Sequence, residues 1–297
     1  MDSVYALAVK FLKGIKFGNT IKDKIILLLF IFRSIISLGI MFTIYGKSRA
    51  LEIYRARVPA RSVIIRRDNV KLAIPLTMDY LNLIKQDYEL EEREFIKNLK
   101  SDGSNYTILD VGANLGFYTM LFSYFFPKAK IISIEASPHT FESLKRNCEL
   151  NGNSSRIVLI NKAVSDRDNK TIEISDRGSK SSIVTGTIEE TNRLAMNKNS
   201  LVVQTMRIDT LAESLGLGEI TLLKMDIEGA ENYALSGAER LINERRIKNM
   251  IIEYHSTENF HYVTRLLSEK GYHIRGPSYT AQAEGEINGH IIATINE

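Results

Sequence analysis

The sequence predicts an α/β fold, with a mostly parallel sheet that carries helices on both faces and an N-terminal helical extension before it. From about residue 105 onward, short apolar segments alternate with helical ones, which is the pattern of repeated βα units. One apolar segment runs directly into a glycine-rich turn at residues 110–116, as strands do at the ligand-binding edge of an open sheet. The 297 residues are 44% hydrophobic and 25% charged, which is enough for one sizeable core with appendages.

Residues 1–60 are expected to form a helical segment that is both apolar and basic. The apolar run Ile25–Tyr45 is long enough to span a bilayer, but Arg33 interrupts it at a cost of about 2.5–3.5 kcal/mol on insertion scales. The run starts too late, behind too many lysines, for an ordinary cleaved signal peptide. Because basic residues lie on both flanks of this run, the excess of positive charge on cytoplasmic loops does not predict how a spanning helix would be oriented. Three interpretations stay open: a membrane anchor, a helix lying on the membrane surface, or a helix packed on the main domain.

The charge and cysteine content restrict the partners and the compartment. The net charge is +4, and the basic excess lies mostly near the N-terminus, where it could face anionic lipid or nucleic acid. No zinc-finger spacing or aromatic RNA-binding motif supports nucleic acid, so we expect a solvated surface and no nucleic-acid partner. The single cysteine, Cys148, cannot form an intrachain disulfide. The expected location is therefore the cytoplasm, with attachment to the cytoplasmic face of the membrane left open. The oligomeric state is not predicted.

Residues 61–104 are expected to lead into the main domain, which covers residues 105–297. Ser62–Arg66 and Lys71–Ile74 flank an Asp-Asn pair that favours a tight turn, so a β-hairpin is predicted there. A charged amphipathic helix follows over Tyr88–Leu99.

The main domain is expected to contain alternating strands and helices. Strands are predicted over Thr107–Val111, Ile131–Ile134, Ile157–Ile160, Thr221–Met225 and Met250–Glu253. Helices are predicted over Gly116–Tyr124, His139–Leu150, Ala230–Asn243 and Phe260–Lys270. Thr171–Ser175 and Leu201–Arg207 are predicted to pair antiparallel, and Tyr272–Ile274 and His290–Thr294 are candidates for final strands.

The turn after the first strand of this domain indicates what the sheet edge binds. It reads D-x-G-x-N-x-G, in which the named letters are Asp110, Gly112, Asn114 and Gly116. Glycines let the backbone turn tightly and let a ligand approach, although many such turns need glycine only for packing. The dinucleotide fingerprint G-x-G-x-x-G and the Walker lysine are both absent. An acid before the glycines would repel phosphate and attract an ammonium group. S-adenosylmethionine (SAM) has such a group and no phosphate.

The second strand ends at Glu135, about 20 residues after the glycine turn. A carboxylate at this place can accept hydrogen bonds from two ribose hydroxyls. The alternative is a surface acid at the end of a strand. At this distance from the turn, ribose binding is the favoured interpretation.

Acidic residues cluster where the strand Thr221–Met225 ends. Asp226, Glu228 and Glu231 follow it, and clustered acids tend to have raised pKa values. Asp226 is the first candidate for a general base toward a substrate hydroxyl. These acids could instead bind a metal or cap the next helix, which is the role expected for Glu231. The sequence does not demand a magnesium ion, and no metal ligand is assigned.

The next strand ends with Glu253 and His255, which are expected to face the same cleft as Asp226. Histidine is suited to proton transfer near neutral pH, so His255 is the second candidate base. A surface histidine with no role in catalysis is the alternative.

These residues give the chain a resemblance to the FkbM family of SAM-dependent methyltransferases. The segments that carry it are 108–119, 134–152, 161–168, 207–213, 222–238 and 251–255, in an order and spacing that match along roughly residues 105–275. The resemblance implies a class I methyltransferase fold with a seven-stranded sheet, and usually O-methylation. It implies a SAM site at the glycine turn, with Glu135 at the ribose, Ala163 and Val164 near the adenine, and Asp226 beside the methyl group.

The predictions for the site are as follows. The cofactor is SAM, and the residues expected to bind it are Asp110, Gly112, Ala113, Asn114, Gly116, Glu135, Ala136, Ala163 and Val164. The expected catalytic residues are Asp226, His255 and Glu228. The predicted reaction is in-line methyl transfer to a hydroxyl of a sugar, a lipid or a small metabolite. Two alternatives are a nicotinamide-dependent oxidoreductase, which needs the absent fingerprint, and a non-catalytic membrane-tethered module. The choice of acceptor is expected to lie in the loop at about 176–200 and in the N-terminal segment.

Overall fold

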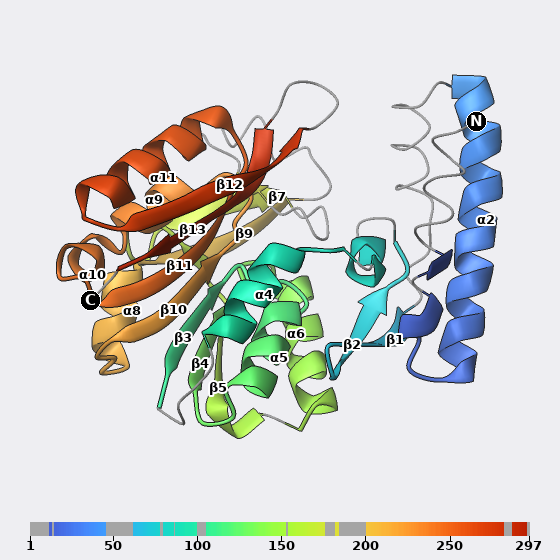
Figure 1. The fold of residues 1–297 in the computed structure, drawn as a ribbon, viewed down its shortest axis with the longest axis horizontal. Helices are drawn as coiled ribbons and strands as arrows, with labels where there is room; N and C mark the ends of the chain where they lie inside the picture. The colour runs from blue at the N-terminus through green and yellow to red at the C-terminus, as the bar shows by residue number, and fades with distance from the viewer. Residues whose placement is uncertain are drawn as a thin grey trace. The chain divides into compact units, whose positions relative to one another are not determined.

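The computed structural model divides the chain into two units, Met1–Glu91 and Glu92–Glu297 (Figure 1). It describes residues 12–13, 15–45, 62–77, 80–85, 87–99, 105–152, 154–175, 182–183, 200–281 and 287–295. Most of the loop at 176–200, where the choice of acceptor was expected to lie, falls outside these ranges. All of residues 1–11 and 46–61 also fall outside them.

The first unit contains a long helix and a hairpin. Its elements are η1 (Ile15–Phe17), α2 (Ile21–Tyr45), β1 (Ser62–Arg67), β2 (Val70–Pro75) and η2 (Tyr80–Ile84). The predicted hairpin is confirmed, with Arg67 opposite Val70 and positive φ angles at Asp68 and Asn69 in the turn. The start of α2 is capped reciprocally, because Thr20 and Asp23 each bind the backbone N–H of the other.

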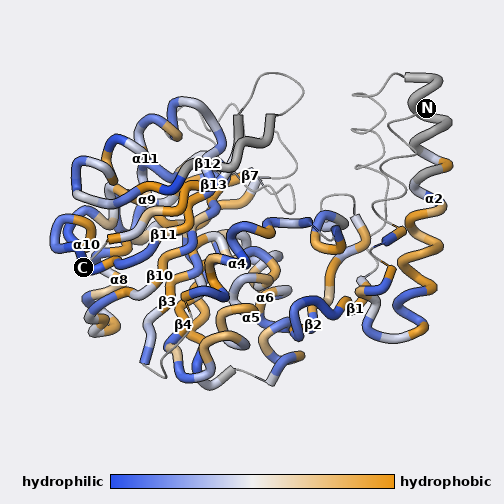
Figure 2. Tube along the Cα trace, viewed as in Figure 1, coloured by the Kyte–Doolittle hydropathy of each residue, from blue (hydrophilic) through white to orange (hydrophobic). Residues whose placement is uncertain are grey.

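The helix α2 is apolar over much of its length (Figure 2). Leu27, Ile31 and Ser34 are buried on one side of it. Among the side chains of α2 whose burial the structure describes, which end at residue 37, the exposed large apolar ones are Ile21, Ile25, Leu28, Leu29, Phe32 and Ile36. Within the described parts of the chain, no helix combines the length and the hydropathy that crossing a lipid bilayer requires.

The second unit is built on the predicted seven-stranded sheet. In spatial order its strands are β12 (His273–Ala281), β13 (Ile287–Thr294), β11 (Ile247–Tyr254), β10 (Ile220–Met225), β3 (Thr107–Val111), β4 (Lys130–Ile134) and β5 (Ile157–Ile160). The five strands from β11 to β5 pair parallel, whereas β13 runs antiparallel to both β11 and β12. The sheet is therefore mostly parallel with an antiparallel pair at its C-terminal edge, as the sequence predicts.

Helices cover both faces of this sheet (Figure 1). The helices of the chain from residue 90 onward are α4 (Leu90–Asn98), α5 (Phe117–Phe125), α6 (Pro138–Leu150), η3 (Ser154–Arg156), α8 (Ile208–Ser214), α9 (Glu231–Ser236), α10 (Glu239–Asn243) and α11 (Thr257–Glu269). The connections through α5 and α6 lead from β3 toward β5, and the connection through α9 and α10 leads the other way, from β10 to β11. Because β3 and β10 are neighbours, the strand order reverses between them, and a crevice is expected at their carboxyl ends.

Segments between β5 and β10 in the sequence form a second, smaller sheet. Its order is β6 (Ala163–Val164), β9 (Ser200–Met206), β7 (Thr171–Ser175) and β8 (Ser182–Ile183). The antiparallel pairing of β7 with β9 confirms the prediction, with Thr171 opposite Gln204.

The prediction of a single helix over Ala230–Asn243 is wrong, because the chain forms two helices there, α9 and α10. They meet at Gly237, where an added Cβ would lie 2.1 Å from the carbonyl oxygen of Ser165. The buried carboxylate of Asp209 accepts the backbone N–H groups of Arg240 and Leu241 at 3.0 and 3.1 Å. Asp209 thereby caps the start of α10 from α8, a helix that the sequence analysis missed.

Candidate functional site

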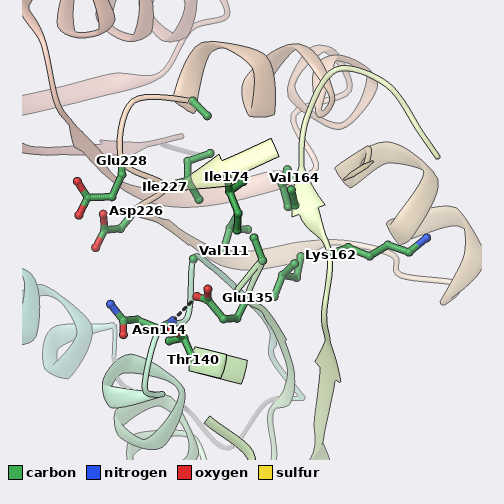
Figure 3. Close-up of a pocket in the computed structure, with 15 residues that line it drawn as sticks. Val111, Asn114, Glu135, Thr140, Lys162, Val164, Ile174, Asp226, Ile227 and Glu228 are labelled. Carbon is green, nitrogen blue, oxygen red and sulfur yellow. Dashed lines mark hydrogen bonds between the residues drawn. The ribbon is translucent and has the colours of Figure 1, made fainter. Parts of the chain in front are cut away.

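A pocket lies where the sequence predicts it, at the carboxyl ends of β3, β4 and β10 (Figure 3). Six of the nine expected cofactor-binding residues line it: Gly112, Asn114, Glu135, Ala136, Ala163 and Val164. Two of the three expected catalytic residues, Asp226 and Glu228, line it as well, together at one end. Asp110, Ala113, Gly116 and His255 are not among its lining residues.

The turn after β3 is held close to both neighbouring strands. The backbone N–H groups of Gly112 and Ala113 both donate to the carbonyl oxygen of Ile134 at 2.9 Å. Gly112 has a φ of +77°, and a Cβ there would lie 1.8 Å from the carbonyl oxygen of Asp226. Asn114 also has a positive φ, of +52°. The turn therefore requires glycine at position 112 for its conformation and for the approach of β10.

Glu135 joins this turn to the start of α6. One carboxylate oxygen accepts the N–H of Asn114 at 2.9 Å (Figure 3). The other accepts the N–H of Ser137, also at 2.9 Å. Burial raises the pKa of Glu135 to about 7, although these two N–H groups favour its ionised form. Each oxygen keeps acceptor capacity, so the carboxylate can still accept two hydroxyl groups. A ribose diol offers two such hydroxyl groups.

Asp110 lies beneath the turn, and its side chain is fully buried. Its Oδ2 accepts the hydroxyl of Thr119 at 2.6 Å, and that hydroxyl also lies 2.9 Å from Ser133 Oγ. Its Oδ1 has no hydrogen-bond partner among the described residues. Burial raises the pKa of Asp110, against the charge of Lys224. A buried oxygen without a partner marks a place where a ligand donor would be favourable.

Ala113 and Gly116 support the turn from outside the pocket lining. Ala113 is buried. Gly116 precedes the first residue of α5, where a Cβ would meet the side chain of Leu144 at 2.6 Å. Their contribution in the structure is to the path of the backbone and to the packing of α5 on α6.

An apolar wall forms another part of the pocket. Ala163 and Val164 of β6 lie there with Ile134 and with Ile174 of β7. The sequence analysis missed Ile174, because only the pairing of the second sheet brings β7 to this place. It also missed Lys162 and Thr140, which line the pocket and carry no motif signal of their own. The wall offers an apolar surface of the kind that can receive an aromatic ring.

The acidic end of the pocket begins with Asp226, directly after β10. Its Oδ2 lies 3.1 Å from Nζ of Lys224, which is buried and lies 4.9 Å from the centre of the Tyr118 ring. Burial opposes ionisation of Asp226, but the charges of Lys224 and His255 outweigh it and lower its pKa to about 2. Asp226 is therefore a carboxylate at any ordinary pH.

His255 follows β11 and reaches the same group of acids. Its Nδ1 lies 2.9 Å from Oε1 of Glu231, and its Nε2 lies 3.5 Å from Glu228, 3.5 Å from Glu253 and 3.7 Å from Asp226. Burial disfavours the charged imidazole, but the hydrogen bond to Glu231 and the nearby charges raise the pKa of His255 to about 9. These distances bring His255 and Glu253 close to Asp226, but neither residue is among those that line the pocket.

Asp226, Glu228 and His255 each offer one ligand atom, and these atoms lie within 4.8 Å of one another. Side chains of this kind could hold a divalent cation. Acidic groups also gather at functional sites without an ion, and we assign none here.

Proteins of similar sequence carry methyltransferase names. Residues 110–274, more than half of the chain, match the family model described as the FkbM methyltransferase domain. The 2-O-methyltransferase NoeI of Sinorhizobium fredii is 28% identical over 149 residues, which cover 47% of this chain and 60% of NoeI. The hexuronic acid methyltransferase AglP of Haloferax volcanii is 28% identical over 187 residues, which cover 60% of this chain and 68% of AglP.

Two further comparisons complete this set. Methyltransferase 1 of Beauveria bassiana is 28% identical over 182 residues, which cover 56% of this chain and 71% of that protein. Among solved structures, the SAM-dependent methyltransferase from Agrobacterium tumefaciens superposes with a TM-score of 0.48 at 10% identity, covering 81% of this chain and 72% of that one.

Proposed function

The chain belongs to the FkbM family of SAM-dependent methyltransferases, and on this premise we propose that it methylates a hydroxyl group of a sugar. The single observation that carries the proposal is the pocket itself, which has the Glu135 carboxylate at one side and the acids Asp226 and Glu228 at the other. The family assignment replaces the alternative of a nicotinamide-dependent oxidoreductase.

The residues of the pocket fit SAM as the methyl donor. Glu135 can accept both ribose hydroxyls, and the wall of Ala163, Val164 and Ile174 suits the adenine. The buried Asp110 Oδ1, which lacks a partner among the described residues, suits an interaction with the ammonium end of the donor. We assign Gly112 and Asn114 to backbone contacts with the donor, because both line the pocket.

The acidic end suits a hydroxyl acceptor. Carboxylates accept hydrogen bonds from hydroxyl groups, so Asp226 and Glu228 can orient a sugar beside the methyl group. When bound, SAM supplies a methyl group that its positively charged sulfur has already activated. The remaining task of the protein is to place the acceptor oxygen in line and to receive its proton. The relatives NoeI and AglP, named for 2-O-methylation and for a hexuronic acid, support a sugar in preference to a lipid head group or another small metabolite.

The experiment that tests this function is a labelled-methyl transfer assay. Purified protein, SAM with a labelled methyl group and fractionated extract of the source organism are combined, and the labelled product is identified. We expect release of S-adenosylhomocysteine together with a labelled methoxy group on a sugar. A protein that binds SAM but transfers its methyl group to no component of any fraction would instead be a non-catalytic module.

We also propose that α2 holds the protein at a membrane surface. In the part of α2 whose side chains are described, the six exposed apolar residues fall on one side of the helix, opposite the buried Leu27 and Ile31. Lys22, Lys24 and Arg33 are exposed around this apolar stripe. A helix with an apolar stripe and flanking cations lies well in the interface of an anionic membrane. In this proposal residues 1–60 form the attachment segment, residues 61–104 the lead-in and residues 105–297 the methyltransferase domain.

A further inference from the structure

Glu231 is a buried carboxylate that the motif-based assignment of the site leaves without a catalytic role. Its side chain is 0% exposed, and it begins α9 directly after the acidic turn. Its Oε1 accepts the N–H of Gly229 at 3.0 Å, and its Oε2 accepts the amide of Asn259, on α11, at 2.6 Å. Two helices and a turn therefore hold the carboxylate in one orientation.

This fixed carboxylate determines which nitrogen of His255 is available. An ionised carboxylate only accepts hydrogen bonds, so the 2.9 Å contact requires that Nδ1 of His255 carries a proton. The other nitrogen, Nε2, then faces the pocket-lining acids Asp226 and Glu228 at 3.7 and 3.5 Å. Both distances exceed those of ordinary N–H···O hydrogen bonds, so a hydroxyl group can compete for Nε2.

We propose that Glu231 is a positioning residue, which holds His255 so that Nε2 faces the acceptor and removes the proton of the acceptor hydroxyl. The inference rests on the proposed O-methylation. It reverses the order of the two candidate bases that the sequence indicated, and it adds a residue to which the sequence analysis assigned only a helix-capping role.

The proton and electron balance of the step is complete. The acceptor oxygen forms its bond to the methyl carbon with a lone pair, and the sulfur of the donor keeps the electron pair of the broken bond. The proton of the acceptor passes to Nε2 of His255, and the buried charge of Glu231 stabilises the resulting imidazolium. Asp226 is the weaker base of the two, because Lys224, 3.1 Å away, stabilises its ionised form and lowers its pKa.

The groups that face His255 set the pH range of this step. Carboxylates approach the imidazole from α9 (Glu231), from the end of β10 (Asp226), from the turn after it (Glu228) and from β11 (Glu253). Lys224 pairs with Asp226, and His290 of β13 lies 3.3 Å from Glu253 and 3.0 Å from Glu92. Because the carboxylates keep His255 protonated below a pH of about 9, its basic form grows as the pH rises toward that value.

The first test needs neither donor nor acceptor. The imidazole signals of the ligand-free protein are titrated by NMR in buffer that contains EDTA, so that no bound cation contributes. The chain has five histidines, and the variant His255→Asn identifies the relevant signal. We expect the midpoint of His255 near the value above in the native protein and lower by about one unit or more in Glu231→Gln. Glu239→Gln is the matched control, because Glu239 is the exposed first residue of α10.

The second test is the pH profile of methyl transfer, measured as kcat/KM with the acceptor that the labelled-methyl transfer assay identifies. In the native protein we expect a rate that rises to a plateau near pH 9. In Glu231→Gln the rising limb should move to lower pH and the plateau should fall about tenfold or more. Calorimetry should show an affinity for S-adenosylhomocysteine within about twofold of the native value, because Glu231 does not line the donor pocket.

A second variant separates the charge of Glu231 from its position. Glu231→Asp keeps the charge but is one methylene shorter, so it should lose the hydrogen bond to Nδ1. The midpoint should therefore fall less than in Glu231→Gln, while the plateau falls as well. This variant also serves if Glu231→Gln does not fold. A His255 midpoint that is unchanged in Glu231→Gln would overturn the proposal, as would a native rate that is flat up to pH 9 and falls above it. Absence of any methyl transfer by the native protein would contradict the proposed function instead, and the NMR titration would remain interpretable.

Discussion

Gly112 and Asp226 approach each other so closely that a single added Cβ on the glycine would lie 1.8 Å from the carbonyl oxygen of Asp226. The N–H of Asp226 also donates to the carbonyl of Val111 at 3.0 Å. The glycine turn after β3 and the acidic end after β10 are therefore parts of one rigid unit. A substitution in the turn should therefore also displace Asp226.

The variant Gly112→Ala tests this relationship. An alanine at a positive φ costs about 1–2 kcal/mol by itself, and at position 112 the clash with the backbone of β10 adds to that strain. Gly152→Ala is the matched control, because Gly152 has a φ of +69° and nothing within 4 Å of the added Cβ. We expect Gly152→Ala to cost only the strain. Gly112→Ala should unfold at clearly lower denaturant concentration and bind S-adenosylhomocysteine at least tenfold more weakly. Equal behaviour of the two variants in denaturation and calorimetry would contradict the rigid unit.

Donor binding should depend on the ionisation of Glu135. Because burial raises its pKa to about 7, the carboxyl gains a proton as the pH falls from 8 to 6, and it then loses acceptor capacity for the ribose. We expect calorimetry to show weaker binding of S-adenosylhomocysteine at pH 6 than at pH 8. Glu135→Gln should weaken binding by roughly 10- to 100-fold at pH 8 and remove this pH dependence, since the amide donates where a backbone N–H already points. Glu149→Gln, an exposed acid at the end of α6, should behave as the native protein does.

His255 should make the stability of the protein pH-dependent. Its pKa in the folded protein, about 9, lies above the unfolded value of about 6.5, so the folded state retains a proton that the unfolded state releases. The resulting stabilisation, on the order of 3 kcal/mol, is complete below about pH 6.5 and is lost as the pH rises through about 9. Denaturation of the native protein across this range should show the loss, and His255→Asn should not show it. His139→Asn, at an exposed histidine, should retain the native dependence.

Membrane attachment through α2 can be measured with vesicles. The full chain should sediment with vesicles of phosphatidylcholine and phosphatidylglycerol, and less with phosphatidylcholine alone, because cations flank the apolar stripe. Phe32→Glu should weaken this binding roughly tenfold or more, since it removes a large apolar contact and adds repulsion. Val202→Glu makes the same kind of change at an exposed apolar residue of β9, and it should bind as the native protein does. Native protein that stays wholly in the supernatant with both vesicle types would contradict the attachment.

The sequence alone predicts the mostly parallel sheet, most of its strands and helices, and most of the pocket. Apolar residues that recur every second residue indicate a strand, and those that recur every 3.6 residues indicate a helix. The carboxyl ends of parallel strands meet at one edge of the sheet. For this reason Gly112, Glu135 and Asp226 could be placed at one edge before any coordinates were known. The break between α9 and α10 could not be read in this way, because it depends on the contact of Gly237 with Ser165, 72 residues earlier in the chain.

What the sequence by itself determined was the fold, the family and the edge of the sheet at which the chemistry lies, since these follow from local patterns repeated along the chain. Only the tertiary structure decided how the charges at that edge act on one another. Glu231 and His255 are 24 residues apart and come within hydrogen-bond distance only through the packing of α9 against the end of β11. The same folding pairs Asp226 with the buried Lys224 and lowers its pKa. The strength of a base depends on burial and on distances between groups from different strands, and a linear pattern of residues does not contain those distances.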